Sequence, residues 1–119
     1  ILLSVRLTIP HPLPDLNSYI NAERTNKFKA AKIKREATEL CGWYVKKLKP
    51  IKGQADFTFT WFVPNQKKDP DNISFGAKMI LDSLVKAGKL PNDNLRYIRS
   101  ITHFFEIGSP KVTIDIEEC

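Results

Sequence analysis

The feature that most constrains the fold is a nine-residue segment, 55–63, in which apolar side chains alternate with mostly polar ones. Its apolar positions are Ala55, Phe57, Phe59, Trp61 and Val63. A period of two places these side chains on one face of a β-strand, and aromatic residues favour that extended conformation. We therefore expect this segment to lie in a sheet with that face buried.

Three other segments also have strand patterns. Residues 3–9 alternate apolar and polar side chains until the proline-rich stretch 10–14 ends the strand, because proline lacks a backbone donor. Residues 95–105 are expected to form a third strand, and Val112, Ile114 and Ile116 mark the buried face of a fourth. The turn at residues 108–110 (Gly-Ser-Pro) lies between these two strands and predicts a hairpin.

Two segments have the three-to-four-residue spacing of apolar side chains that is typical of helices. The first is expected over residues 21–48, and the second from Asp71 or Asn72, either of which can cap a helix, to Gly88. Their apolar positions are Ala30, Ile33, Ala37, Leu40, Cys41, Tyr44 and Leu48 in the first and Ile73, Ala77, Ile80, Leu81 and Leu84 in the second. The order β-α-β-α-β-β predicts one α+β domain spanning residues 1–119, with a mixed sheet and two helices.

Positive charge is concentrated in one part of the chain. The net charge is +6 and the pI is near 9.4. Residues 21–49 contain nine Lys and Arg against three Glu, a net +6 that equals the whole excess. Such a cluster favours an acidic polymer such as DNA as the partner, with a solvated helix surface as the alternative. The candidate DNA-binding residues of this segment are Lys27, Lys29, Lys32, Lys34 and Arg35.

Several classes of protein find no support in the sequence. Cys41 and Cys119 lack the spacing of a zinc site and are too few for a disulfide framework, and His11 and His103 are interpreted as structural. The five glycines form no G-x-G-x-x-G motif and no P-loop, so no nucleotide cofactor is expected. The apolar residues 1–3 are too few for a signal peptide or a membrane span. We therefore expect a cytoplasmic protein with no membrane partner.

Three aspartates are candidate metal ligands. Asp69 and Asp71 flank a proline where the polar loop 64–68 meets the second helix, and Asp93 lies in the turn beyond that helix. Carboxylate oxygens are the ligands that hard divalent cations prefer, and Mg²⁺ retains several waters, so two or three carboxylates suffice. The alternative is structural, because aspartates also cap helices and initiate turns.

Lys78 is the candidate cation of the same site. At 100° per residue it shares one stripe of the second helix with Asp71, Phe75 and Asp82, and it lies about 10 Å along the axis from Asp71. Its ammonium could stabilise the charge that develops on an attacked phosphate. Asp82, about 16 Å from Asp71, is interpreted as an ion-pair partner of Lys78 or Lys86.

These segments together resemble the RusA family of Holliday junction resolvases, which are carried by phages and prophages. The resemblance covers nearly the whole chain. Its segments are Leu7-Thr8-Ile9-Pro10-His11-Pro12-Leu13-Pro14 with Asn17, then Asp69-Pro70-Asp71-Asn72, Leu81-Asp82-Ser83-Leu84, Lys86-Ala87-Gly88 and Asn92-Asp93.

The resemblance assigns roles to individual residues. Asp69, Asp71 and Asp93 match the essential metal-binding acids of the family. The family prototype has its catalytic lysine four residues after the second aspartate, where this chain has Phe75. The interval from that aspartate to the D-x-L motif is three residues longer here, so Lys78 is the equivalent if those residues were inserted before it. Lys67 and Lys68 are a second source of positive charge beside the scissile phosphate.

The resemblance also implies an activity and an assembly. The expected reaction is Mg²⁺-dependent resolution of four-way junctions by paired nicks with 5′-phosphate ends, with Mn²⁺ as the alternative metal. The expected location is the cytoplasm of a bacterial host cell, with the gene on the bacterial chromosome or on a phage. A homodimer is expected because a four-way junction has two-fold symmetry and needs two symmetric nicks. The basic first helix would contact phosphates without reading sequence.

Three rival interpretations remain open. A nuclease for other branched DNA would share the site but prefer another structure. A non-catalytic nucleic-acid-binding module would keep the basic helix and use the aspartates as caps and turns. A structural phage protein would dimerise through exposed aromatic residues such as Phe62, Phe104 and Phe105.

Overall fold

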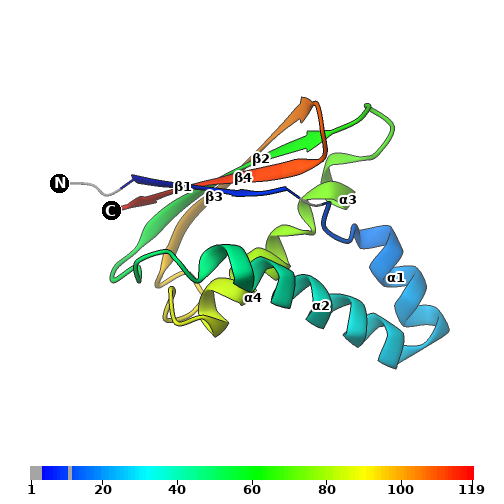
Figure 1. The fold of residues 1–119 in the computed structure, drawn as a ribbon, viewed down its shortest axis with the longest axis horizontal. Coiled ribbons are helices and arrows are strands. Elements are labelled where there is room, and N and C mark those ends of the chain that lie inside the picture. Colours follow the sequence, from blue (N-terminus) through cyan, green and yellow to red (C-terminus); the bar gives the residue numbers. More distant parts are fainter. Residues whose placement is uncertain (1–3, 11) are drawn as a thin grey trace.

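The computed structural model describes residues 4–10 and 12–119 (Figure 1). Leu3, at the start of the first predicted strand, and His11 lie outside the described residues. The elements are, in chain order, β1 (Ser4–Ile9), α1 (Leu16–Thr25), α2 (Lys27–Val45), β2 (Ala55–Val63), α3 (Pro70–Ser74), α4 (Ala77–Lys86), β3 (Ile98–Ile107) and β4 (Lys111–Glu118). The predicted α+β class is confirmed.

The four strands form one mixed sheet in the order β1-β4-β2-β3. Strand β4 pairs antiparallel with both β1 and β2, whereas β2 and β3 run parallel. The predicted mixed sheet is therefore confirmed, and the aromatic strand β2 takes an inner position with a partner on each edge.

The predicted hairpin between the last two strands is wrong. Strands β3 and β4 follow each other along the chain but lie on opposite edges of β2. The connection crosses over the end of β2, where the amide of Gly108 donates to the carbonyl of Val63 at 2.9 Å. A Gly-Ser-Pro turn signals a reversal of direction, but it carries no information about which strands become neighbours.

The first helical region begins earlier than predicted and contains a break. It starts at Leu16 rather than near residue 21, after Asp15, whose carboxylate accepts from the Ser18 amide at 2.8 Å. At Asn26 the backbone is extended, and the Asn26 side chain accepts from the Phe28 amide at 2.8 Å. An Asn side chain that accepts from the free amides at a helix N-terminus lets a new helix begin there in place of a continuous one. The single predicted helix is therefore two, α1 and α2.

The second helical region is also divided. Helix α3 begins at Pro70 with Asp69 at its N-cap, not with Asp71 or Asn72, and α4 ends near the predicted stop at Gly88, which has a φ of 74°. The break falls at Gly76, which packs on Trp61: a Cβ there would lie 3.0 Å from the Trp61 ring. This close approach favours a residue without a side chain and places the α3–α4 junction directly on β2.

The helices lie together on one side of the sheet (Figure 1). Phe57, Phe59 and Trp61 of β2, three of the predicted face, are buried in the core beneath them. Ile80 and Leu84 of α4 and Ala37, Cys41 and Val45 of α2 pack into the same core. Among the described residues, none of the helices combines the length and apolar composition that crossing a membrane requires.

His103 of β3 has a structural role, as predicted, and its titration gives a test. Its Nδ1 accepts from the Trp61 indole at 2.9 Å, and burial lowers the pKa of its imidazole. The unfolded chain therefore binds this proton more tightly than the folded protein. We expect the contribution of this group to the free energy of unfolding to fall as pH drops below about 6.5 and then to level off. Denaturant titrations across this range should show the slope in the wild type and a smaller slope in His103→Gln.

Candidate functional site

The two aspartates before the second helical region are exposed at its start. Asp69 occupies the N-cap position of α3, but its carboxylate makes no capping hydrogen bond. Asp71 lies in the first turn of α3, and neither carboxylate has a hydrogen-bond or ion-pair partner within the described part of the chain. Simple side-chain capping therefore does not account for Asp69. Both carboxylates present oxygens that suit a hard divalent cation.

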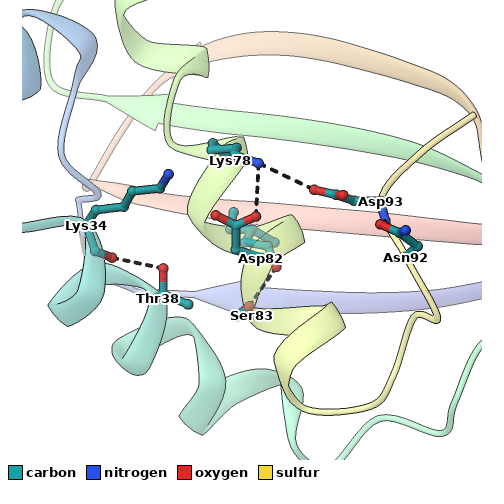
Figure 2. A network of polar contacts seen from close by, with 8 residues as sticks. Lys34, Thr38, Lys78, Asp82, Ser83, Asn92 and Asp93 are labelled. Carbon is teal, nitrogen blue, oxygen red and sulfur yellow. Dashed lines mark hydrogen bonds and ion pairs between the residues drawn. The ribbon is translucent and has the colours of Figure 1, made fainter. Parts of the chain in front are cut away.

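Lys78 connects two further aspartates (Figure 2). Its Nζ lies 3.1 Å from the Asp82 carboxylate one turn along α4, which confirms the predicted i,i+4 pair. The same Nζ lies 3.5 Å from the carboxylate of Asp93, in the loop that follows α4. The bond to Asp82, opposed by partial burial and assisted by the charge of Asp93, raises the pKa of Lys78. The two carboxylates thus fix the Lys78 ammonium in place, where the loop after α4 returns to the helix.

Asp71 and Lys78 lie on one nearly continuous helical path. Short backbone bonds join α3 to α4 across Gly76: its amide donates to Ile73 at 3.2 Å, and the Lys78 amide donates to Phe75 at 3.0 Å. Seven residues along such a path span about 10 Å. Phe75, which stands where the family prototype has lysine, packs its ring 5.3 Å from Tyr19 of α1 and is partly buried.

The metal ligands predicted from the sequence do not form a compact cluster. Within residues 4–10 and 12–119, no three His, Cys, Asp or Glu side chains lie close enough together to hold a metal ion. Asp93 is brought to Lys78 and Asp82, while Asp69 and Asp71 stand at the start of α3. The donor set fits Mg²⁺ chemically, and the three-aspartate site stays a prediction.

Asn72 has a structural role that the sequence did not reveal. Its side chain is buried, and its Oδ1 accepts from the Asn17 amide of α1 at 2.8 Å. A second link lies beside it, where the Lys68 ammonium is 2.6 Å from Asp15. Burial would raise the pKa of Asp15, but the bonds from Lys68 and Ser18 outweigh it and hold that pKa below its usual range. These links hold the start of α1 beside the segment that carries Asp69 and Asp71.

The basic residues predicted to bind DNA lie mostly on the exposed face of α2. Lys27, Lys29, Lys32 and Arg35 are exposed and Lys34 is partly so. In Figure 2 the Lys34 side chain extends from α2 toward α4. Sequence reasoning missed Phe28, which is 87% exposed between Lys27 and Lys29. An exposed aromatic ring among lysines is typical of surfaces that stack on nucleic-acid bases.

Comparison with known proteins adds no assignment. No family model matches the chain, and no curated protein sequence matches it. Among similar solved structures is a thiamine-monophosphate kinase from Stenotrophomonas maltophilia, with 7% sequence identity and a TM-score of 0.42. The likeness covers 98% of this chain but 30% of that enzyme. At this level it supports no statement about function.

Proposed function

We propose that the protein is a Mg²⁺-dependent endonuclease of the RusA type that resolves four-way DNA junctions. The observation that supports this most is the ion pair between Lys78 and Asp93. It joins a loop acid, predicted as a metal ligand, to the lysine predicted to act on the phosphate. The contact brings the loop after α4 back to the helix, so that Asp93 and Lys78 lie together as a shared site requires.

In this proposal each group has a separate task. Asp69, Asp71 and Asp93 would hold the metal through carboxylate oxygens, with waters completing its shell. A Mg²⁺ ion held there, or Mn²⁺ in its place, would supply a Lewis acid for the phosphate and would make a coordinated water more acidic. The Lys78 ammonium, kept charged by Asp82 and Asp93, would neutralise charge on the phosphate oxygens. Lys67 and Lys68 would hold the neighbouring backbone.

Replacing Lys78 with methionine should slow Mg²⁺-dependent cleavage by about 100-fold to 1,000-fold, the usual cost of removing one transition-state donor. Junction binding should change little, because a single phosphate contact is lost among many. Single-turnover rates and gel-shift affinities measure the two effects. Lys86→Met is the matched control, since Lys86 is an exposed lysine two turns further along α4 with no ion pair to Asp82 or Asp93. Equal rates for the two variants would remove Lys78 from the mechanism.

The proposed activity is tested by offering a panel of labelled substrates with Mg²⁺: a four-way junction, a flap, and a linear duplex of the same sequence. A resolvase should make paired nicks in opposed strands of the four-way junction and leave the duplex intact. Preference for the flap would favour the broader branched-DNA nuclease. Binding without cutting of any substrate would favour the non-catalytic module, which the basic face of α2 alone could support.

We also propose a homodimer, supported by the outer edge of β3. That strand has no partner on its outer side among the described strands, and Ile101, Phe104 and Ile107 are 44%, 55% and 57% exposed. A long apolar edge strand is a template for pairing with another chain. Sedimentation should give the mass of a dimer for the wild type and of a monomer for Phe104→Lys. Leu95→Lys, at a more exposed apolar site outside the strand, should remain dimeric.

A further inference from the structure

A pocket opens at the end of the sheet nearest to Asp69. Its volume is about 340 Å³, at the lower end of the range for small-molecule sites. Three connections meet there: the proline-rich exit of β1, the loop from β2 to α3, and the crossover from β3 to β4. The walls are mainly apolar and include Leu13, Trp61, Phe62 and Pro64.

The charged groups of this pocket are mostly cationic. Lys67, Lys68 and Lys111 line it, against a single acid, Asp15. Lys68 already neutralises Asp15 at 2.6 Å. The ammonium of Lys111 lies 4.7 Å from the centre of the Phe62 ring. The pocket therefore combines apolar walls with two lysines that no aspartate or glutamate of the described residues neutralises. This combination suits a flat neutral ring with negatively charged groups beside it.

The side-chain oxygens of Asn65 and Asp15 in the walls already accept hydrogen bonds. The Asn65 carbonyl accepts from the Lys67 amide at 3.0 Å. One Asp15 oxygen accepts from the Ser18 amide and the other from Lys68. Each of these oxygens therefore already accepts one hydrogen bond, which leaves few free polar groups to read the edge of a base. Recognition in this pocket would rest on stacking and charge, which is tolerant of base identity.

The pocket shares its rim with the proposed active site. Lys68 of the rim precedes Asp69 directly, and Ile73 of α3 lies in the wall. We infer that the pocket accepts one unstacked nucleobase of the DNA strand, with the adjoining phosphates on Lys67 and Lys111. This inference rests on the proposed function, because it assigns the pocket to the same DNA substrate. A nucleotide at a branch point is the least costly to unstack.

The test measures DNA binding in EDTA, so that no cleavage is needed. Two four-way junctions are compared, one carrying an extra unpaired thymidine at the branch point and one carrying an abasic nucleotide in its place. Stacking of one base is worth about 1–3 kcal/mol, so the wild type should bind the abasic junction about tenfold more weakly. Equal affinity for the two junctions would overturn the inference.

Two variants show whether the preference arises in the pocket. Asn65→Trp places an indole at an exposed position of the wall, where it should fill the pocket and abolish the preference for the base-containing junction. Gln66→Trp changes the next residue, which is exposed but does not line the pocket, and should keep the tenfold preference. A preference that survives in Asn65→Trp would place the base elsewhere and overturn the inference.

The outcomes separate this inference from the proposed function. A protein that cuts junctions with Mg²⁺ but binds both junctions equally overturns the pocket assignment and leaves the nuclease. A protein that prefers the base, loses this preference in Asn65→Trp and never cuts supports the pocket and overturns the nuclease. Absence of DNA binding overturns both.

Discussion

Replacing Asp71 with asparagine is expected to reduce Mg²⁺-dependent cleavage of a four-way junction by on the order of 1,000-fold. Metal assistance is worth several kcal/mol of transition-state stabilisation, and each 1.36 kcal/mol is a tenfold change in rate. Asparagine keeps the size of the side chain but removes its charge. Because the Asp71 carboxylate is exposed and has no partner among the described residues, the free energy of unfolding should change little.

Asp115→Asn is the control for this variant. Asp115 lies on β4, and its carboxylate accepts from Arg6 of β1 at 2.7 Å. The same chemical change there should leave the cleavage rate within about twofold, because a single exposed ion pair is worth at most about 1 kcal/mol of stability and none of the proposed chemistry. Junction affinity in EDTA should be preserved in both variants. Full activity of Asp71→Asn would exclude Asp71 from the site.

Replacing Phe59 with alanine is expected to lower the free energy of unfolding by about 3–5 kcal/mol. Phe59 is fully buried on the inner strand β2, with its ring 5.9 Å from Trp61 and 5.2 Å from His103. The change removes buried apolar surface and leaves a cavity. Because β2 has a neighbouring strand on each edge, the backbone cannot easily move to close that cavity. For a small domain, stable by about 5–15 kcal/mol, this is a large fraction of the total.

Urea titration followed by tryptophan fluorescence gives this difference directly. Phe28→Ala is the control, since Phe28 is 87% exposed on α2 and its removal should cost less than about 0.5 kcal/mol. A loss at Phe59 no larger than at Phe28 would contradict the position of β2 at the centre of the core.

Local patterns predicted the elements better than their arrangement. The alternation over 55–63 gave both the strand β2 and its buried face, because side-chain direction in a strand depends only on residue parity. The break at Asn26 was missed, since a capping side chain competes with a helical period that continues on both sides. The place of β2 between β3 and β4 depends on contacts between distant segments, which no turn signal encodes.

The same division holds for the candidate site. The pair of Lys78 with Asp82 was predictable because residues four apart meet on any helix. The contact between Asp93 and Lys78 was not predicted, since it needs the loop after α4 to fold back. The bond from Asn17 to Asn72 joins residues far apart in the sequence and left no local signal. The pocket beside Asp69 is built from three connections that are distant in the sequence, so no local pattern predicted it either.

The central claim is that the protein cuts branched DNA with the help of a divalent metal. The most direct measurement incubates the wild-type protein with an end-labelled four-way junction, with Mg²⁺ or with EDTA, and separates the strands on a denaturing gel. We predict paired nicks at symmetric positions with Mg²⁺ and none with EDTA. An uncut junction with both Mg²⁺ and Mn²⁺, under conditions where the protein binds it, would contradict the account.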